Sequence, residues 1–542
     1  MHFRIRSVVV SLVLCTAFSG FADNPIVQTY FTADPAPMVY KDTVFLYTSH
    51  DEDITLKPQG KDYLFFTMND WKLYSTVDMV NWTDHGTVAS GKTFSWFTDN
   101  AWAPQTVERN GKFYMYCPIN NNSGAKIGVL VADNPYGPFK DPVGKEIAMS
   151  GNMAIDPTVF VDDDGQAYLF WGNGNLRMVK LNSDMISTTG NVTSNINVRD
   201  FMEGPWFYKR GSLYYMVYAA GSGGGANEKI SYATSSSPNG PWTYKGDIFN
   251  PTNINTNHSG VIDYKGHSYC FYHTGALSNN DGFKRSVCVE EFTYGSDGSI
   301  PKLSMSSNGP KQVDTLNPFD TVQAETICYS SGLKTGTCSE GGIEVNNIDN
   351  NDYIKVKGVG FGDGATKFEA RVAPNSGSGK IELRLGSQSG TLIGTCTIDG
   401  SGSAWTTKSC TVSGATGVQD LFLKFTGSGS NLFKFNWWKF ESATGVGSSA
   451  KSNNQKSSRL LVSQKDAGTI TFSLQSPEIV QGNSITLTIS DLQGRTVTTV
   501  SSNAQISGTE AFSINKNSIR SGMYMIRASS DGKVLYNNSY KL

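Results

Sequence analysis

Five positions along this chain could bring acid–base chemistry together. Five segments share a pattern in which a short apolar strand is followed by a turn at Gly or Asp and then by an aromatic-rich strand. Counting back eight or nine residues from each turn reaches Asp34, Ala103, Asp156, Glu203 and His258. Asp-Pro and Glu-Gly-Pro can also be turn residues that open a strand. Three acids at one register of otherwise apolar strands nevertheless indicate function, because like charges held close together are costly.

The elements that position these residues are predicted to be the blades of a propeller. The segments are separated by roughly 45–70 residues, which is enough for a four-stranded blade each time. Helical periodicity is nearly absent between them. The sequence therefore predicts an all-β fold whose first domain, residues 23–310, is a five-bladed β-propeller with the five positions at one mouth of its channel. The segments are DPAPMVYKDTVFLY (34–47), APQTVERNGKFYMY (103–116), DPTVFVDDDGQAYLF (156–170), EGPWFYKRGSLYYMVY (203–218) and HSGVIDYKGHSYCFY (258–272).

The composition narrows the classes of ligand. The chain has 45 Lys and Arg against 47 Asp and Glu, a formal net charge of −2, so nothing in it favours nucleic acid or an anionic membrane. Aromatic residues make up 12% and there are 56 glycines, a composition typical of β-rich proteins. Abundant aromatic rings suit a neutral sugar ligand, although all-β packing alone would also account for them.

Residues 25–305 resemble glycoside hydrolase family 43. The likeness rests on ADPAP around Asp34, AWAPQ around Trp102, IDPTVFVDDDG around Asp156, MEGPW around Glu203 and NHSGVIDYKG around His258. It implies that Asp34 is the general base, Glu203 the general acid and Asp156 the residue that tunes the acid's pKa. Such an enzyme hydrolyses with inversion, using two carboxyl groups roughly 6.5–9.5 Å apart.

The resemblance also implies binding residues around the acids. Phe31 and Trp102 are expected to form sugar-stacking walls, and Arg285 is expected to reach sugar hydroxyls. His258 has two interpretations: it lies near a bound calcium or water, or it is a hydrogen-bonded residue that fills the channel. The chemistry requires no cofactor, and any calcium would be structural or electrostatic because calcium prefers oxygen ligands.

Residues 318–442 resemble a family 6 carbohydrate-binding module, a β-sandwich. The matching stretches are VQAET (322–326), NNIDNNDYIKVKGVGFG (346–362) and NLFKFNWWKF (431–440). The resemblance implies a sugar site with Trp405 and Asn431. Asn347 stands where a second aromatic ring is often found, so Tyr353 either supplies that ring or is a packed strand residue. Glu325 resembles a residue of the module's calcium site.

The two ends of the chain predict export. Residues 1–22 have a basic start, an apolar run and small residues, as in a secretory signal peptide cleaved after Ala22. Residues 443–457 form a Ser/Gly/Asn linker. Residues 458–542 alternate apolar and polar residues, which predicts a small β-sandwich. That sandwich resembles C-terminal sorting domains, which implies type IX secretion machinery as a partner and a secreted or cell-surface protein; the alternative is a spacer.

Four functions remain open at this point. The leading one is an exo-acting α-L-arabinofuranosidase that removes side chains from arabinoxylan. A β-xylosidase and an endo-arabinanase would use the same acids. A non-catalytic carbohydrate-binding propeller is the alternative of another class, and the presence of all three acids argues against it.

Overall fold

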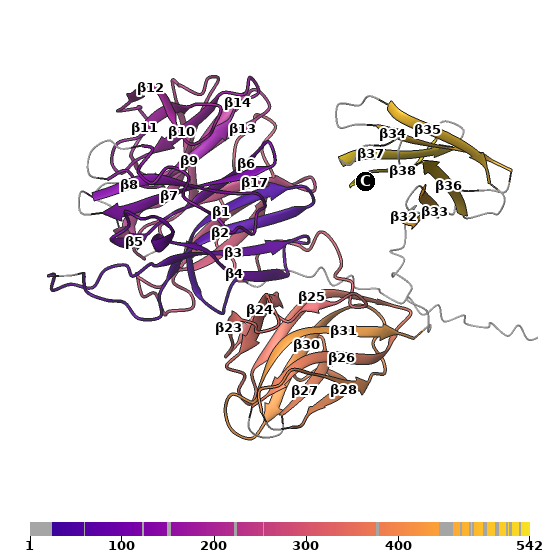
Figure 1. Ribbon diagram of the computed structural model, residues 1–542. Coiled ribbons are helices and arrows are strands. Elements are labelled where there is room, and N and C mark those ends of the chain that lie inside the picture. The colour runs from indigo at the N-terminus through magenta and orange to yellow at the C-terminus, as the bar shows by residue number, and fades with distance from the viewer. Residues whose placement is uncertain are drawn as a thin grey trace, which may run out of the picture. The chain divides into compact units, whose positions relative to one another are not determined.

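The structure is a computed structural model (Figure 1), and it describes residues 24–443 and 459–541 with short gaps. The predicted signal peptide and nearly all of the predicted linker lie outside the described residues. The described part is almost entirely β, with two short 3₁₀ helices, η1 (Gly91–Thr93) and η2 (Gly225–Asn227). None of its helices is long and apolar enough to span a membrane. The gaps are 59, 122–123, 149–152, 222–224, 253, 376–378, 401, 467–468, 476–478, 480–481, 491–495, 505–508, 516–518, 520–522 and 531–532.

Residues 31–292 form five antiparallel sheets in chain order. The first contains β1 (Phe31–Tyr40), β2 (Thr43–Asp51), β3 (Asp70–Thr76) and β4 (Trp82–Ser90). The second contains β5 (Asp99–Ala101), β6 (Gln105–Arg109), β7 (Lys112–Asn121) and β8 (Gly124–Ala132). The third contains β9 (Thr158–Val161), β10 (Ala167–Trp171), β11 (Arg177–Leu181) and β12 (Thr188–Thr193). The fourth contains β13 (Phe201–Arg210), β14 (Leu213–Ala220), β15 (Lys229–Ser235) and β16 (Thr243–Phe249), and the fifth β17 (Gly260–Tyr264), β18 (His267–Thr274) and β19 (Ser286–Phe292).

The strands β1, β6, β9, β13 and β17, one from each sheet, form a closed ring. β1 contacts β6, β6 contacts β9, β9 contacts β13, and β17 contacts β1. Between β13 and β17, the Trp206 indole N–H donates to the Val261 carbonyl at 3.0 Å. The N-terminal segment closes the last sheet, because the Ile26 N–H donates to the Val287 carbonyl of β19 at 2.9 Å. This closed ring of sheets is a β-propeller, as predicted.

Both faces of a propeller sheet are buried, so the strands of the sheet are almost continuously apolar. Strand β18 is an example. Side chains alternate between the two faces of a strand. Cys270 and Tyr272 enter one hydrophobic cluster, whereas Tyr269 and Phe271 enter another. Each blade thus packs against a neighbour on either side, and this packing fixes where the inner strands begin.

Residues 322–442 form the predicted β-sandwich. One sheet contains β23 (Lys334–Thr337), β24 (Ile343–Asn346), β31 (Phe433–Ser442), β26 (Ala365–Pro374) and β29 (Thr406–Thr411), with β20 (Val322–Gln323) paired to β31. The other contains β22 (Tyr329–Ser331), β25 (Tyr353–Gly362), β30 (Gly417–Gly427), β27 (Gly379–Leu385) and β28 (Thr391–Ile398). A single hydrophobic core, including Trp438 and Phe425, fills the space between the sheets.

Propeller and sandwich belong to one compact unit, and they are joined by backbone and buried polar contacts. The short strand β21 (Thr326–Ile327) extends the first propeller sheet by pairing with β4. The Asn81 side chain donates to the Lys357 carbonyl and accepts from the Lys357 N–H, each at 2.9 Å. The Thr335 hydroxyl donates to the buried Asp84 carboxylate at 2.6 Å. These bonds fix the sandwich against the outer edge of the first blade.

The C-terminal region is a second compact unit with its own core. Buried Ile485, Leu487 and Ile489 alternate with more exposed threonines along one strand, as the period-two pattern predicts. One sheet contains β32 (Arg459–Asp466), β33 (Thr469–Gln475) and β36 (Thr509–Asn515). The other contains β35 (Thr496–Asn503), β34 (Ser484–Ser490), β37 (Met523–Ser530) and β38 (Lys533–Lys541).

Candidate active site

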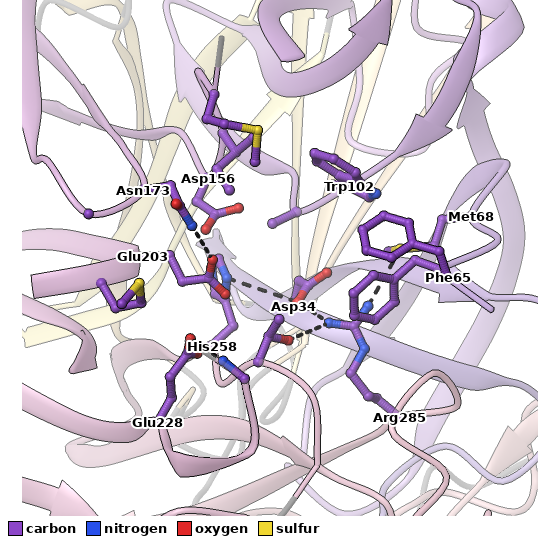
Figure 2. A pocket seen from close by; sticks show the side chains of 18 residues that line it. Asp34, Phe65, Met68, Trp102, Asp156, Asn173, Glu203, Glu228, His258 and Arg285 are labelled. Atoms are coloured by element: carbon purple, nitrogen blue, oxygen red, sulfur yellow. Dashed lines mark hydrogen bonds and ion pairs between the residues drawn. The ribbon is translucent and has the colours of Figure 1, made fainter. Parts of the chain in front are cut away.

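A cavity of about 550 Å³ collects the predicted acids from different blades. Figure 2 shows Asp34, Asp156 and Glu203 with their carboxyl groups turned into this cavity, together with His258 and Arg285. Asp34 is 5%, Asp156 6% and Glu203 9% exposed, so all three carboxyl groups are buried. The structure therefore brings together the residues that the shared register predicted.

The backbone is irregular where the acids are held. The register of β1 against β2 shifts between Ala33 and Ala36, around Asp34. The register of β13 against β14 shifts on both sides of Glu203. Asp34 and Asp156 have φ values of 51° and 57°, a conformation that non-glycine residues rarely adopt. Irregularities of this kind redirect side chains and concentrate at functional sites, so they support a catalytic interpretation of these strand starts.

Asp34 is held as an ionised carboxylate. Its Oδ1 accepts from Arg285 Nη1 at 2.9 Å, and its Oδ2 accepts from the Ser49 hydroxyl. Burial alone would raise the pKa of this carboxyl group, but the Arg285 charge and the Ser49 hydrogen bond help to outweigh it, and the pKa is lowered. Such a carboxylate can accept a proton from water.

A second carboxylate, which sequence reasoning missed, anchors Arg285. Asp51 ends β2, is fully buried, and accepts from Arg285 Nε and Nη2, each at 2.9 Å. Arg285 Nη1 also donates to the Thr256 hydroxyl at 3.0 Å. Arg285 thus bridges two carboxylates in the bidentate geometry that guanidinium favours. Asp51 could have been found from the sequence, because it is an acidic residue at the end of the otherwise uncharged, largely apolar stretch TVFLYTS.

Glu203 has the opposite electrostatic environment. Burial, followed by the negative charges of Asp156 and Glu228, raises its pKa well above the ordinary value. Burial and the charge of Asp34 raise the pKa of Asp156 to about 8. Asp156 Oδ2 accepts from the Gly204 N–H at 2.9 Å, which favours its ionised form. We therefore place the proton of this pair on Glu203.

Glu228 and Asn173 are further cavity residues that sequence reasoning missed. The Asn173 amide donates to Glu203 Oε2 at 2.8 Å and so orients that carboxyl group. Glu228 accepts from the Asn257 N–H at 2.9 Å and from the Gly225 N–H at 3.0 Å. Burial raises the pKa of Glu228 to about 7. Both residues lie outside the repeated register, where the sequence carried no signal for them.

The fifth blade contributes two buried histidines. His258 Nδ1 lies 4.0 Å from Asp34 Oδ1, and burial lowers the pKa of the imidazole. His273 Nδ1 accepts from the Asp34 backbone N–H at 3.1 Å, so its other nitrogen carries the proton that faces the Thr256 carbonyl. Burial lowers the pKa of His273 to about 3, which keeps it neutral. His258 thus lies beside the Asp34 carboxylate, at a separation longer than a hydrogen bond.

The metal alternative for His258 gains no support from side-chain geometry. Among the described residues, the group of three side chains whose ligand atoms lie close enough to hold a metal is His50, Glu52 and Asp70. The Lys72 ammonium lies 3.5 Å from Asp70, so a cation already balances that carboxylate. His258 is not part of the group.

Aromatic side chains form one wall of the cavity. Trp102 lies there as predicted, and its ring centroid is 6.4 Å from that of Phe65. Phe66 packs edge-on against Phe65, with centroids 5.2 Å apart. Phe31, predicted as the other wall, is not among the residues that line the cavity; Lys284 Nζ lies 6.0 Å from its ring centroid. The loop between β2 and β3 supplies Phe65 and Phe66 in its place.

The residues predicted to bind sugar in the sandwich lie on different sheets. Trp405 precedes β29, and its indole N–H donates to the Ser339 hydroxyl at 2.9 Å. Asn431 precedes β31 and has a φ of 50°. Tyr353 begins β25 in the other sheet, with its ring 6.4 Å from Tyr329. The structure thus gives Tyr353 aromatic neighbours within its own sheet, Tyr329 and Phe422.

Glu325 fits a cation site in one respect. It is buried, and its Oε2 has no hydrogen-bond partner among the described residues. Burial and, to a smaller extent, the Asp84 charge raise its pKa to about 9. Carboxylate oxygen is the ligand type that calcium prefers, so this orphaned atom is compatible with the calcium that the resemblance implied.

Comparison with known families divides the chain in the same way. Residues 22–300 match glycosyl hydrolases family 43, residues 323–442 match the carbohydrate-binding module of family 6, and residues 465–538 match a secretion system C-terminal sorting domain. These matches coincide with the propeller, the sandwich and the C-terminal unit.

Known proteins are similar over more than three quarters of the chain. An arabinoxylan arabinofuranohydrolase of Bacillus subtilis is 36% identical over 478 residues, which are 77% of this chain and 92% of that protein. The one of Paenibacillus polymyxa is 35% identical over 480 residues, covering 78% and 75%. The crystal structure of a Bacillus subtilis arabinoxylan arabinofuranohydrolase in complex with cellotetraose superposes with a TM-score of 0.68 at 33% identity, covering 78% of this chain and 99% of that one. With the three acids in one cavity, these findings show that the chain belongs to glycosyl hydrolase family 43.

Proposed function

We propose that this protein is a secreted, inverting α-L-arabinofuranosidase that removes arabinose side chains from arabinoxylan. The observation that carries the proposal is the opposite shift of two carboxyl pKa values in one cavity: that of Asp34 is lowered and that of Glu203 is raised. Inversion requires one ionised and one protonated carboxyl group at the same pH. The similarity to two arabinoxylan arabinofuranohydrolases supports the choice of substrate.

The two carboxyl groups divide the reaction between them. Asp34 takes a proton from a water molecule, whose oxygen attacks the anomeric carbon of the arabinose. The bond from that carbon to the leaving oxygen breaks as Glu203 gives its proton to that oxygen. Asp34 ends protonated and Glu203 ionised, so a proton transfer through solvent restores the starting state.

The neighbouring residues support these roles. Asp156 and Glu228 keep the proton on Glu203 by placing negative charge nearby. Arg285, fixed by Asp51, keeps Asp34 ionised. No cofactor is needed for these proton transfers.

Burial of the acids favours exo action. Asp34, Asp156 and Glu203 are each less than a tenth exposed, and Phe65, Phe66 and Trp102 stand beside them. A side-chain or terminal sugar can enter such a cavity, whereas the middle of a polymer needs an open groove. This observation supports an arabinofuranosidase over an endo-arabinanase.

A β-xylosidase is the second candidate. A xylosidase/arabinosidase of Bacteroides ovatus is 31% identical over 314 residues, 50% of this chain and 94% of that protein. Incubation with wheat arabinoxylan and, separately, with xylobiose separates the two functions. Release of arabinose alone supports the proposal, and faster release of xylose from xylobiose would replace it. Inactivity of the folded protein on aryl pentosides as well would favour a non-catalytic binding propeller.

The attached regions fit action on an insoluble polymer outside the cell. We propose that Trp405 and Asn431 contribute a sugar site in the family 6 module, and that Glu325 contributes to a structural calcium site there. Retention of residues 318–442 on insoluble xylan tests the first role, and a calcium-dependent melting temperature that Glu325→Gln abolishes tests the second. We assign the C-terminal unit to export by the type IX machinery, and secretion that stops when residues 458–542 are removed would support this assignment.

A further inference from the structure

The two sheets of the sandwich meet where β28 and β29 follow each other in the chain. β28 is the last strand of one sheet and β29 the last strand of the other, and the two strands contact each other; β28 can be followed in Figure 1. Each carries one cysteine, Cys396 on β28 and Cys410 on β29. Neither cysteine lines the active-site cavity, and the mechanism uses neither of them.

The backbone brings these two cysteines opposite each other. The Ser413 N–H donates to the Ile393 carbonyl at 3.0 Å. Because the chain reverses direction between the strands, three residues onward from Ile393 and three residues back from Ser413 reach Cys396 and Cys410. Gly394 allows the close approach, since a Cβ there would lie 2.9 Å from the last carbonyl oxygen of β29. The cysteines therefore share one level of the join between the sheets.

Their side chains also meet. Cys396 is fully buried in the sandwich core, and half-buried Cys410 packs against the same core. The Cys396 thiol and the Cys410 sulfur share a hydrogen bond. A disulfide needs sulfur atoms about 2.05 Å apart. Two thiols that are already in contact are the starting arrangement for such a bond.

The propeller offers a contrast in its pair Cys270 and Cys288. In the register of β18 and β19, Cys270 lies opposite Glu290 and Cys288 lies opposite Tyr272. The two cysteines are thus diagonal neighbours, with backbones about 7–8 Å apart. A disulfide usually spans about 4.4–6.8 Å between Cα atoms. The Cys288 thiol instead contacts the Thr274 hydroxyl at 3.7 Å.

We infer that Cys396 and Cys410 form a disulfide bond that joins the two sheets of the sandwich once the protein is exported. The match of residues 465–538 to a secretion system sorting domain supports export, and disulfides form and persist in exported proteins. The inference relies on the export that is part of the proposed function, but not on which sugar the active site removes.

The environment of Cys410 makes it the cysteine that reacts first. It is partly exposed, whereas the other described cysteines are buried. The hydrogen bond from Cys396 lowers the pKa of Cys410, while the same bond and burial raise the pKa of Cys396. The thiolate is the nucleophile in thiol–disulfide exchange, so the more accessible and more acidic thiol attacks the oxidant.

The oxidant is an exchangeable disulfide outside the cytoplasm, either of an oxidoreductase or of a small thiol compound. The Cys410 thiolate attacks one of its sulfur atoms, and the other sulfur leaves as a thiolate. Cys396 loses its proton to solvent and attacks Cys410 Sγ, which expels the second sulfur of the oxidant. The two cysteines have then lost two electrons and two protons, and the oxidant has been reduced to two thiols.

The bond closes a loop of 15 residues, from Cys396 to Cys410, which includes Trp405. A cross-link of this length restricts the unfolded chain and so stabilises the folded one. Reduction with dithiothreitol is therefore expected to lower the melting temperature of the full chain by about 5 °C.

Peptide mapping tests the bond directly. The secreted full chain, or the purified full chain after incubation with oxidised glutathione, is alkylated with N-ethylmaleimide, denatured and digested with trypsin. Cleavage after Arg384, Lys408 and Lys424 places the two cysteines on separate peptides, 385–408 and 409–424. Mass spectrometry is expected to find these peptides linked, with a mass two hydrogens below their sum, and to find them separate after reduction.

Variants assign the stability effect to this pair. Cys396→Ala with Cys410→Ala is expected to melt at the same temperature with and without dithiothreitol. Cys288→Ala, in the propeller, is the matched control and should keep the fall on reduction that the parent shows. Circular dichroism verifies that each variant is folded, and the peptide map of the parent needs no variant at all.

The order of the two steps is tested with the reduced, folded single variants. Cys396→Ala retains Cys410 and should form a mixed disulfide with an aromatic disulfide reagent at least tenfold faster than Cys410→Ala, which retains only buried cysteines among those that the structure describes. Equal rates would contradict the assignment of Cys410 as the attacking thiol.

Two outcomes would overturn the inference. Recovery of peptides 385–408 and 409–424 with both thiols alkylated, from secreted and from glutathione-treated protein, would show that the bond does not form. A link from either peptide to a different cysteine would show that the pairing is wrong. Failure to release arabinose would challenge the proposed function but would leave the peptide map unchanged.

Discussion

The active-site cavity and the outer face of the sandwich sheet around Tyr353 both carry charged and aromatic side chains, but they bury the charges to different degrees. Asp34 and Glu203 are 5% and 9% exposed, whereas Lys355 and Lys424 are only partly buried. Burial makes each charge in the cavity depend on its neighbours, so that similar carboxyl groups acquire opposite pKa shifts. Charge near solvent can attract a ligand, but proton transfer requires the buried arrangement.

The largest expected effect comes from replacing the proton donor. Glu203→Gln keeps the shape of the side chain but has no proton to give, so kcat on substrates with poor leaving groups should fall by about 10²–10⁴-fold. Aryl arabinofuranosides with activated leaving groups should lose much less. Glu441→Gln, an exposed glutamate of the sandwich, should change neither rate. An equal loss on all leaving groups would contradict the role of Glu203 as general acid.

The next effect concerns stability. Arg285→Met leaves the buried carboxylates of Asp34 and Asp51 without their cation, and breaking a buried pair in this way costs about 3–5 kcal/mol. Lys284→Met, next to it and only partly buried beside Asp281, should cost less than about 1 kcal/mol. Denaturant unfolding at pH 7 measures both. A similar loss of unfolding free energy in the two variants would show that burial of the charge does not determine the cost of removing it.

The Arg285 effect should also depend on pH. The pKa of Asp34 is lowered in the folded protein, so the stability that it contributes is present above its unfolded pKa. That contribution is lost as the pH falls through the lowered folded pKa. The difference in unfolding free energy between the native protein and Arg285→Met should therefore shrink in acid, and a difference that grows there would contradict the assignment.

A smaller effect, on the pH dependence of activity, should come from replacing Glu228, which lines the cavity. Burial, Asp156 and Glu228 together raise the pKa of Glu203, and activity is lost as the pH rises through that pKa. Glu228→Gln removes one negative charge, so the alkaline limb of kcat/KM should move to lower pH by up to about one unit. The acid limb, which reports Asp34, should stay in place. A shift to higher pH would show that Glu228 does not act on Glu203 through its charge.

What the sequence could predict of this site follows from periodicity. Asp34, Asp156 and Glu203 were found because each stands eight or nine residues before a turn, and packing of the blades converts this shared register into proximity. Arg285 and Asp51 are 234 residues apart, and their pairing follows from ring closure rather than from any local pattern. The spacing of residues within a blade can therefore be read from the sequence, whereas pairs of residues that meet across different blades cannot.

The position of Phe31 outside the lining of the cavity has a related cause. Phe31 begins β1 three residues before Asp34, so it was expected at the mouth. The long connection between β2 and β3 instead returns across the cavity and presents Phe65 and Phe66. The path of such a loop depends on tertiary packing, which neither composition nor alternation encodes. In the sandwich, likewise, the alternation that places Tyr353 on an outer face does not specify its neighbours.

The smallest expected effect is that of salt on hydrolysis. The catalytic charges are paired inside the cavity, where mobile ions screen them little, and an uncharged aryl arabinofuranoside has no charge to be steered. Raising ionic strength from about 50 mM to 500 mM should therefore change kcat/KM by less than about twofold, whereas exposed pairs weaken as the Debye length shortens. If hydrolysis falls several-fold over this range, the carboxylates act while exposed to solvent, and burial does not shield them from mobile ions.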